Sequence, residues 1–200
     1  MFGDISPKPL SYPVTAKVDH VDEYHGTKVA DPYRWLEDPD SAETKAWVEA
    51  ENKVTFGYLE QIPERPQIKD RLMRLWNYER YGVPFQQGGR YFISKNDGLQ
   101  NQSALYTIET LHGPTRELLD PNKLSADGTV ALSGLDVSED GLHLAYGLST
   151  AGSDWQEWNV RDVQSGRDLS DHLNWVKFSG ASWDHEGKGF FYSRYDQPNE

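Results

Sequence analysis

The chain has 200 residues, of which 26% are charged and 12% are aromatic, and its seven Trp supply large side chains for a hydrophobic core. A formal net charge of −12 disfavours binding to nucleic acid or to anionic membrane surfaces, because those partners are also negatively charged. The absence of Cys excludes disulfides, thiol nucleophiles and thiolate metal sites.

The amino-terminal segment has none of the features of a targeting sequence. "MFGDISPKPLSYPVT", Met1 to Thr15, lacks the basic end and the apolar run of a signal peptide. No apolar stretch approaches the length needed to span a bilayer. We therefore expect a soluble cytoplasmic protein, or a periplasmic or secreted one if a signal peptide has been removed.

Two amphipathic helices are predicted between Asp40 and about Trp76, because apolar residues recur there at helical spacing. Asp40 and Glu43 resemble a capping box at the start of the first helix. Pro63 is expected to close the first helix, and Pro66 suits the first turn of the second. The apolar positions are Trp47, Ala50, Val54 and Tyr58 in the first helix, and Ile68, Leu72, Leu75 and Trp76 in the second.

After Tyr81 the apolar residues alternate with a period of two, which indicates short β-strands. Turns rich in Gly, Asn and Pro separate these short strands. No long helix is expected after Tyr81. The predicted strands lie within Arg90–Asn96, Ser103–Glu109, Thr115–Asp120, Gly141–Ser149, Glu157–Val163 and Phe190–Tyr195.

Two segments of this region repeat one pattern at an offset of 46 residues. "LDVSEDGLHLAY", Leu135 to Tyr146, and "ASWDHEGKGFFY", Ala181 to Tyr192, both place an acidic turn and a Gly before an apolar strand that ends in Tyr. A looser copy, "QQGGRYFIS", begins at Gln86. Repeats of about 40–50 residues with about four short strands are typical of β-propeller blades. A β-sandwich with two similar hairpins is the alternative.

The residues themselves show no catalytic constellation. The nearest match to a nucleophile elbow is "GLSTA", with Ser149 at the nucleophile position, but the residues that follow have strand character instead of starting a helix. We therefore predict that Ser149 is a strand-end residue. No pair of His has the spacing of a metal site, so we expect no metal and no cofactor. The six His are His20, His25, His112, His143, His172 and His185.

The stretch "DEYHGTKVADPYRWLEDPDSAETKAWVEAEN", Asp22 to Asn52, resembles the amino-terminal signature of the prolyl oligopeptidase family, the serine peptidases also called prolyl endopeptidases. The similarity covers nearly the whole chain after Tyr12. It continues through "NYERYGVP" (Asn77–Pro84), "GLQNQSALY" (Gly98–Tyr106), "LLDPN" (Leu118–Asn122), "GSDW" (Gly152–Trp155) and "WVKFSGASW" (Trp175–Trp183).

This resemblance implies an α+β architecture. Residues 1–80 would be the amino-terminal helical segment of an α/β-hydrolase peptidase domain. Residues 81–200 would form the first two blades and the start of the third blade of a seven-bladed β-propeller. The family's Ser, Asp and His triad follows the propeller, so this fragment is expected to hold no catalytic residue and to be inactive alone.

The resemblance also implies one substrate-binding residue, Phe178 of the motif "VKFS", which in the family lines an apolar subsite near the bound peptide. The structural alternative is that Phe178 packs in the core of a blade. Four residues of the helical segment are expected to be apolar anchors that seat it on the hydrolase domain, and these are Tyr33, Trp35, Leu36 and Trp47.

The function implied is that of a serine endopeptidase that hydrolyses short peptides on the carboxyl side of proline. Its expected partners are short proline-containing peptides and the remainder of its own peptidase domain, with the full enzyme a monomer. Two alternatives stay open. One is a non-catalytic propeller fragment that binds peptides or proteins, and the other is a sibling oligopeptidase that cuts after basic residues.

Overall fold

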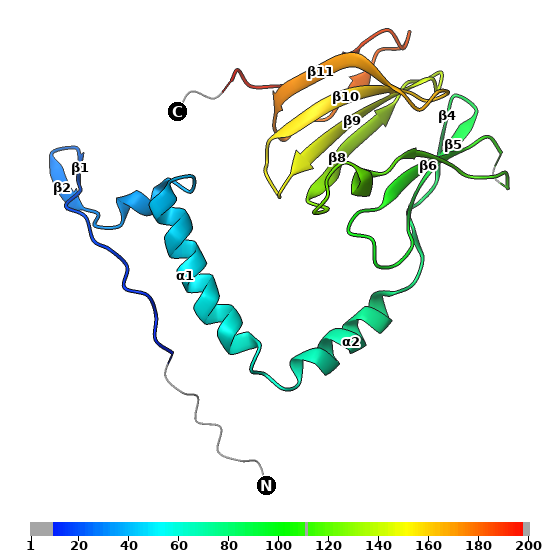
Figure 1. Ribbon diagram of the computed structural model, residues 1–200. Coiled ribbons are helices and arrows are strands. Elements are labelled where there is room, and N and C mark those ends of the chain that lie inside the picture. Colours follow the sequence, from blue (N-terminus) through cyan, green and yellow to red (C-terminus); the bar gives the residue numbers. More distant parts are fainter. Residues whose placement is uncertain (1–9, 111, 198–200) are drawn as a thin grey trace. The chain divides into compact units, whose positions relative to one another are not determined.

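The computed structural model describes residues 10–110 and 112–197 (Figure 1). Residues 1–9, which carry most of the segment considered for a signal peptide, lie outside the described residues. The chain divides into two compact units, Met1–Arg71 and Leu72–Glu200, which are described in turn. In the described part of the chain, no helix is long and apolar enough to cross a membrane.

The first unit contains a hairpin that the sequence patterns did not indicate. Strands β1 (Val21–Tyr24) and β2 (Thr27–Ala30) pair antiparallel. Both central residues of the turn have positive φ, 53° at His25 and 83° at Gly26, as in the type I′ turns that suit the twist of a hairpin. A short 3₁₀ helix, η1 (Arg34–Glu37), follows.

Both predicted helices are confirmed, as α1 (Ala42–Leu59) and α2 (Arg65–Trp76), and Pro66 lies in the first turn of α2 as expected. The predicted capping box at Asp40 is wrong. Ser41 has the extended backbone of a cap residue, and its Oγ accepts a hydrogen bond from the Thr44 amide at 3.2 Å. The Asp40 carboxylate instead lies 3.0 Å from the Lys45 ammonium.

The second unit begins with an antiparallel sheet of five strands. Its order is β3-β5-β6-β7, and β4 also pairs with β5. The strands are β3 (Arg80–Tyr81), β4 (Phe85–Gln87), β5 (Arg90–Asn96), β6 (Ala104–Ile108) and β7 (Arg116–Leu119), and the 3₁₀ helix η2 (Pro121–Lys123) follows. The strands predicted in this region are confirmed.

A four-stranded antiparallel sheet follows, in the order β11-β10-β9-β8, with each strand beside its neighbour in the chain (Figure 1). Its strands are β8 (Val130–Val137), β9 (His143–Thr150), β10 (Gln156–Asp162) and β11 (Asp168–Val176).

A two-stranded hairpin, β12 (Ser182–Trp183) with β13 (Phe190–Phe191), completes the described strands. The strand predicted to continue to Tyr195 is therefore too long. The Tyr195 amide does not extend the hairpin ladder, and donates to the carbonyl of Trp175 at 2.9 Å.

The repeated segments form equivalent hairpin turns, one in each sheet. Gly88, Gly141 and Gly187 all have positive φ, between 54° and 72°. The turns also approach one another closely, because a Cβ added to Gly88 would lie 2.1 Å from the backbone of Asp140. The 46-residue offset in the sequence thus corresponds to a structural repeat.

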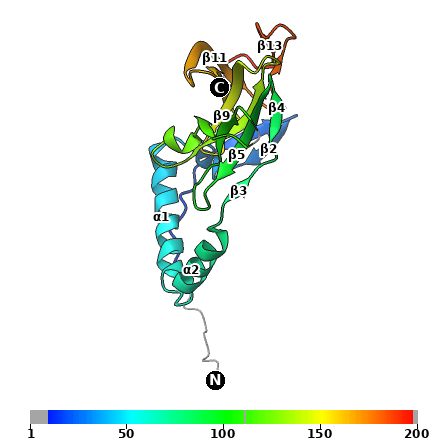
Figure 2. The same cartoon turned by 90° about the vertical axis from the view of Figure 1, so that its right-hand side faces the viewer.

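The core of the second unit lies between its two large sheets, which are side by side in both views (Figures 1 and 2). The five-stranded sheet contributes Phe92, Leu105, Leu118 and Leu119, and the four-stranded sheet contributes Val137, Leu144, Tyr146 and the adjoining Val163. Each sheet consists of consecutive strands, whereas Greek-key sandwiches exchange strands between sheets. This arrangement favours propeller blades over the sandwich alternative.

Polar contacts also join successive sheets. The Arg161 guanidinium donates to the Leu118 carbonyl at 2.6 Å, and Arg116 donates to the Val163 carbonyl. The Trp183 indole N–H donates to the Asp136 carbonyl at 3.0 Å, which fixes the third sheet against the second.

Candidate functional site

The candidate site consists of two loops at one end of the four-stranded sheet. The first loop, residues 151–155, follows β9, and the second loop, residues 177–181, follows β11. Gln156 pairs with Ser149 on one side and with Val176 on the other, so both loops leave the sheet at the same end. The motifs "GSDW" and "VKFS", which are separate in the sequence, therefore meet in space.

Lys177 is the side chain that joins the two loops. Its ammonium lies 3.3 Å from the carboxylate of Asp154 in the first loop. It also lies 5.1 Å from the ring centroid of Trp155 and 5.1 Å from that of Phe178, within the range of cation–π contacts. One charged group thus contacts a carboxylate and two aromatic rings.

Trp155 is itself held by two aromatic neighbours. Its ring packs edge-to-face against Trp175 at 5.9 Å and against Tyr195 at 5.7 Å, the geometry that aromatic pairs prefer. Beside this cluster lies a hollow of about 330 Å³, lined in part by Trp155, Trp175, Leu148 and Thr150. The aromatic cluster is a fixed platform next to an open space.

Phe178, the predicted substrate-binding residue, is 77% exposed. Its side chain is therefore not packed in a core within the described residues. Its φ of 53° is unusual for a residue with a side chain, and Trp175 nearby has a φ of 64°. The role of Phe178 in binding peptide stays a prediction.

Ser149 lies within β9, and its hydroxyl donates to the backbone carbonyl of Ser153. The next element is strand β10, whereas a nucleophile elbow requires a helix there. The prediction that Ser149 is a strand-end residue is confirmed. Across residues 10–110 and 112–197, no group of three potential metal ligands gathers.

A charged cluster occupies the opposite end of the same sheet. The Tyr146 hydroxyl donates to Asp168 at 2.9 Å, and the Arg161 guanidinium donates to both carboxylate oxygens of Asp168. Burial, with the hydrogen bond to Asp168 as a further cause, raises the pKa of Tyr146 to about 12. The hydrogen bonds from Arg161 lower the pKa of Asp168. Because Arg161 also contacts Leu118 of the preceding sheet, this cluster has a structural role.

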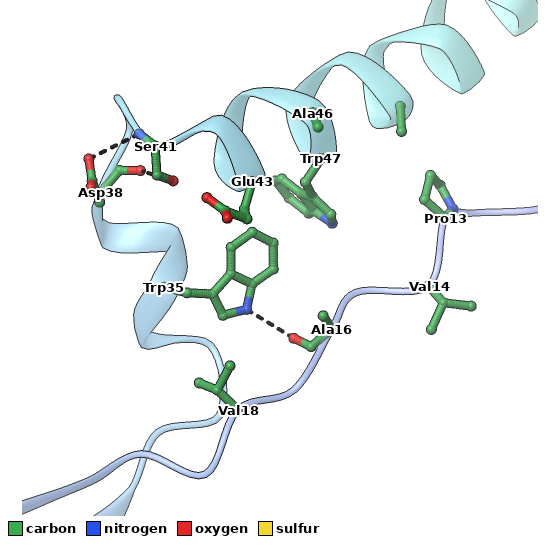
Figure 3. Close-up of a pocket in the computed structure, with 11 residues that line it drawn as sticks. Pro13, Val14, Ala16, Val18, Trp35, Asp38, Ser41, Glu43, Ala46 and Trp47 are labelled. Carbon is green, nitrogen blue, oxygen red and sulfur yellow. Dashed lines mark hydrogen bonds between the residues drawn. The ribbon is translucent and has the colours of Figure 1, made fainter.

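The first unit contains an apolar groove of about 750 Å³ between α1 and the extended segment before β1 (Figure 3). Trp35 and Trp47 meet edge-to-face in it, with their ring centroids 6.5 Å apart. The Trp35 indole donates to the Ala16 carbonyl at 2.9 Å, and the Trp47 indole donates to the Thr15 hydroxyl at 3.1 Å. These two predicted anchors thus fasten the extended segment to η1 and to α1. Their expected contact with a hydrolase domain stays a prediction.

The contact between the two loops was not predicted, and its signal in the sequence is the number of strands that separate the two motifs. Two antiparallel strands, β10 and β11, separate the loops, and an even number of such strands returns the chain to the same end of a sheet. Only β10 coincides with a predicted strand, Glu157–Val163, so the predicted strands by themselves would have placed the two loops at opposite ends of the sheet. No strand was predicted at the position of β11, and the contact depends on that strand.

Comparison with known proteins identifies close relatives along almost the entire chain. Residues 13–200 match the family model described as the prolyl oligopeptidase, N-terminal beta-propeller domain. The prolyl endopeptidase of Elizabethkingia meningoseptica is 49% identical over 191 residues, and that of Dictyostelium discoideum is 32% identical over 237 residues. Each alignment covers 96% of this chain but only 27% and 31% of the relative, so the chain spans less than a third of their length.

Solved structures give the same result. One structure comes from a study of two prolyl endopeptidases. It aligns with a TM-score of 0.83 and 34% identity, and the alignment covers 92% of this chain and 27% of the solved chain. Another is prolyl oligopeptidase B from Galerina marginata bound to a 25-residue macrocyclization substrate. It aligns with a TM-score of 0.80 and 31% identity, and the alignment covers 96% of this chain and 30% of the solved chain.

Proposed function

This chain belongs to the prolyl oligopeptidase family, and we propose that it is the amino-terminal part of a serine endopeptidase that hydrolyses short peptides on the carboxyl side of proline. Family membership is the observation that carries this proposal. The curated relatives are named prolyl endopeptidases, and they are much longer than the region that matches this chain.

In the proposed enzyme, residues 1–80 belong to an α/β-hydrolase peptidase domain. Residues 81–200 form the first two blades and the start of the third blade of a seven-bladed propeller. The two large sheets and the β12–β13 hairpin of the second unit support this division into blades. The catalytic Ser, His and Asp belong to the part of the enzyme that follows the propeller, and the 200-residue chain alone is inactive.

Phe178 is the proposed peptide-binding residue of this region. Its exposed ring lies 5.1 Å from the Lys177 ammonium, which also contacts the Trp155 ring, and it offers an apolar surface to a substrate side chain. The peptide-bound Galerina marginata structures support peptide binding by this family.

The proposal is tested with a blocked peptide that ends in a chromogenic proline amide, together with a serine-directed fluorophosphonate probe. The full-length peptidase should release the chromophore and bind the probe, and the 200-residue chain should do neither. Turnover by the isolated chain, or labelling of Ser149, would contradict the proposed division of the enzyme. The variant Phe178→Ala in the full-length enzyme should raise KM about tenfold with little change in kcat, because it removes ground-state binding surface.

The same assay separates the alternatives. A sibling oligopeptidase would cleave an arginine amide in preference to a proline amide. A non-catalytic propeller would bind peptides without turning over either substrate and without reacting with the probe.

A further inference from the structure

An exposed aromatic side chain makes a poor subsite unless something restrains it. Phe178 is 77% exposed and lies in a loop whose backbone has the left-handed conformation at this residue. A free ring in such a loop would lose rotamer freedom each time a peptide bound, and that entropy loss would weaken binding. Pre-organisation of the ring would avoid the loss.

Lys177 is placed to supply that restraint. Its side chain is only 27% exposed, and its ammonium lies 5.1 Å from the centroid of the Phe178 ring. The other contacts of the ammonium belong to the first loop, because Asp154 pairs with it at 3.3 Å and the Trp155 ring lies 5.1 Å away. The ammonium therefore contacts the Phe178 ring on one side and the first loop on the other.

The first loop gives Lys177 a fixed attachment. Trp155 packs edge-to-face against both Trp175 and Tyr195, and the Tyr195 amide is bonded to the Trp175 carbonyl. The backbone of the second loop is also tied down, because the Ser179 hydroxyl accepts a hydrogen bond from the Ser193 amide at 3.0 Å. These contacts leave the Phe178 ring as the exposed member of an otherwise restrained cluster.

We propose that Lys177 is a positioning residue, whose ammonium links the Phe178 ring to the first loop and so pre-organises the peptide subsite. The inference rests on the proposed function, because Phe178 must contact substrate for its position to matter. Lys177 itself acts through Phe178 and takes no part in bond breaking. Asp154 supports it by holding the ammonium in place.

The test uses the full-length peptidase and the chromogenic proline peptide. Lys177→Met keeps an unbranched side chain of similar length and removes the charge, so it should raise KM three- to tenfold and leave kcat within twofold. Lys177→Arg retains a cation that stacks on aromatic rings, so its KM should stay within twofold of wild type. Lys188→Met is the matched control, because Lys188 is 78% exposed and pairs with Glu186 at 2.6 Å, and its KM should equal that of wild type.

A double-mutant cycle distinguishes positioning from a general loss of structure. In the Phe178→Ala background, Lys177→Met should change KM by less than 1.5-fold, because there is no ring left to position. An equal effect of Lys177→Met in both backgrounds, or no effect in the wild-type background, would overturn the proposal.

Asp154→Asn provides a second variant should Lys177→Met fail to fold. It removes only the carboxylate that holds the ammonium, and it should raise KM by two- to fourfold, again only when Phe178 is present. A wild-type KM for Asp154→Asn would count against the proposal. If instead the wild-type enzyme fails to cleave the proline peptide, the proposed function is what fails, and the two failures are thereby distinguished.

Discussion

The buried hydroxyl of Tyr146 predicts a specific dependence of stability on alkaline pH. Tyr146 is 2% exposed, and its pKa is raised from 10.0 to about 12 in the folded chain. A raised folded pKa contributes stability that is complete below the unfolded pKa and is lost as pH rises through the folded value. Since one pKa unit corresponds to ~1.4 kcal/mol, a loss on the order of 3 kcal/mol is expected in total, with roughly half of it by pH 11.

The variant Tyr146→Phe isolates this contribution. It keeps the ring and removes the hydrogen bond to Asp168, which retains its partner Arg161, so at pH 7 it should lower the free energy of unfolding by about 1–2 kcal/mol. Phe does not ionise, so the variant does not undergo this alkaline loss, which for the wild type is on the order of 1 kcal/mol at pH 11. The stability gap between wild type and variant should therefore nearly close between pH 7 and pH 11.

Urea unfolding followed by circular dichroism at pH 7, 9, 10 and 11 measures this gap. Taking the difference between the two proteins removes the shared titration of other Tyr and Lys residues. Tyr192→Phe, at a position 45% exposed, is the control and should change stability by less than about 0.5 kcal/mol at every pH. A gap that stays constant from pH 7 to pH 11 would mean that the pKa of Tyr146 is not raised in the folded chain.

Three further predictions concern packing and capping. Gly88→Ala should destabilise the chain by about 1–3 kcal/mol more than Gly89→Ala in urea unfolding, because both have positive φ but only Gly88 has backbone atoms 2.1 Å from an added Cβ. Equal losses of stability in the two variants would show that the turns at Gly88 and Gly141 move apart without cost. Ser41→Ala should cost about 1 kcal/mol of helix stability, measured by circular dichroism in urea, whereas Asp40→Ala should cost less than about 0.5 kcal/mol. A larger loss of stability for Asp40→Ala than for Ser41→Ala would mean that Asp40 is the N-cap residue. Leu144→Ala should cost about 2–5 kcal/mol in the same unfolding assay, because Leu144 is fully buried in the core between the sheets. A loss below about 1 kcal/mol would mean that this core is loosely packed.

Local patterns in the sequence predicted both helices and six of the thirteen described strands, because these elements depend on residue spacing along the chain. The repeat that begins at Leu135 and Ala181 was also visible, since each hairpin needs the same Gly at the same turn position. The hairpin of β1 and β2 was missed, because its type I′ turn uses His25, which is a less familiar signal than Asn-Gly.

The candidate site was only partly predictable. Phe178 was nominated through family resemblance, and its exposure was unknown until the strands were placed. The contacts of Lys177 with Asp154 and Trp155 join residues more than twenty positions apart, and they depend on the pairing of two intervening strands. Short-range periodicity carries no information about such contacts.

The strand order has a consequence for how the chain folds during synthesis. From β8 to β11, each strand pairs with the one made immediately before it, so the sheet needs no partner that is still untranslated. Pairing between close neighbours has a low entropic cost of loop closure and is correspondingly fast. The four-stranded sheet can thus assemble as it leaves the ribosome, with its inner strands β9 and β10 paired on both sides before the next sheet is made.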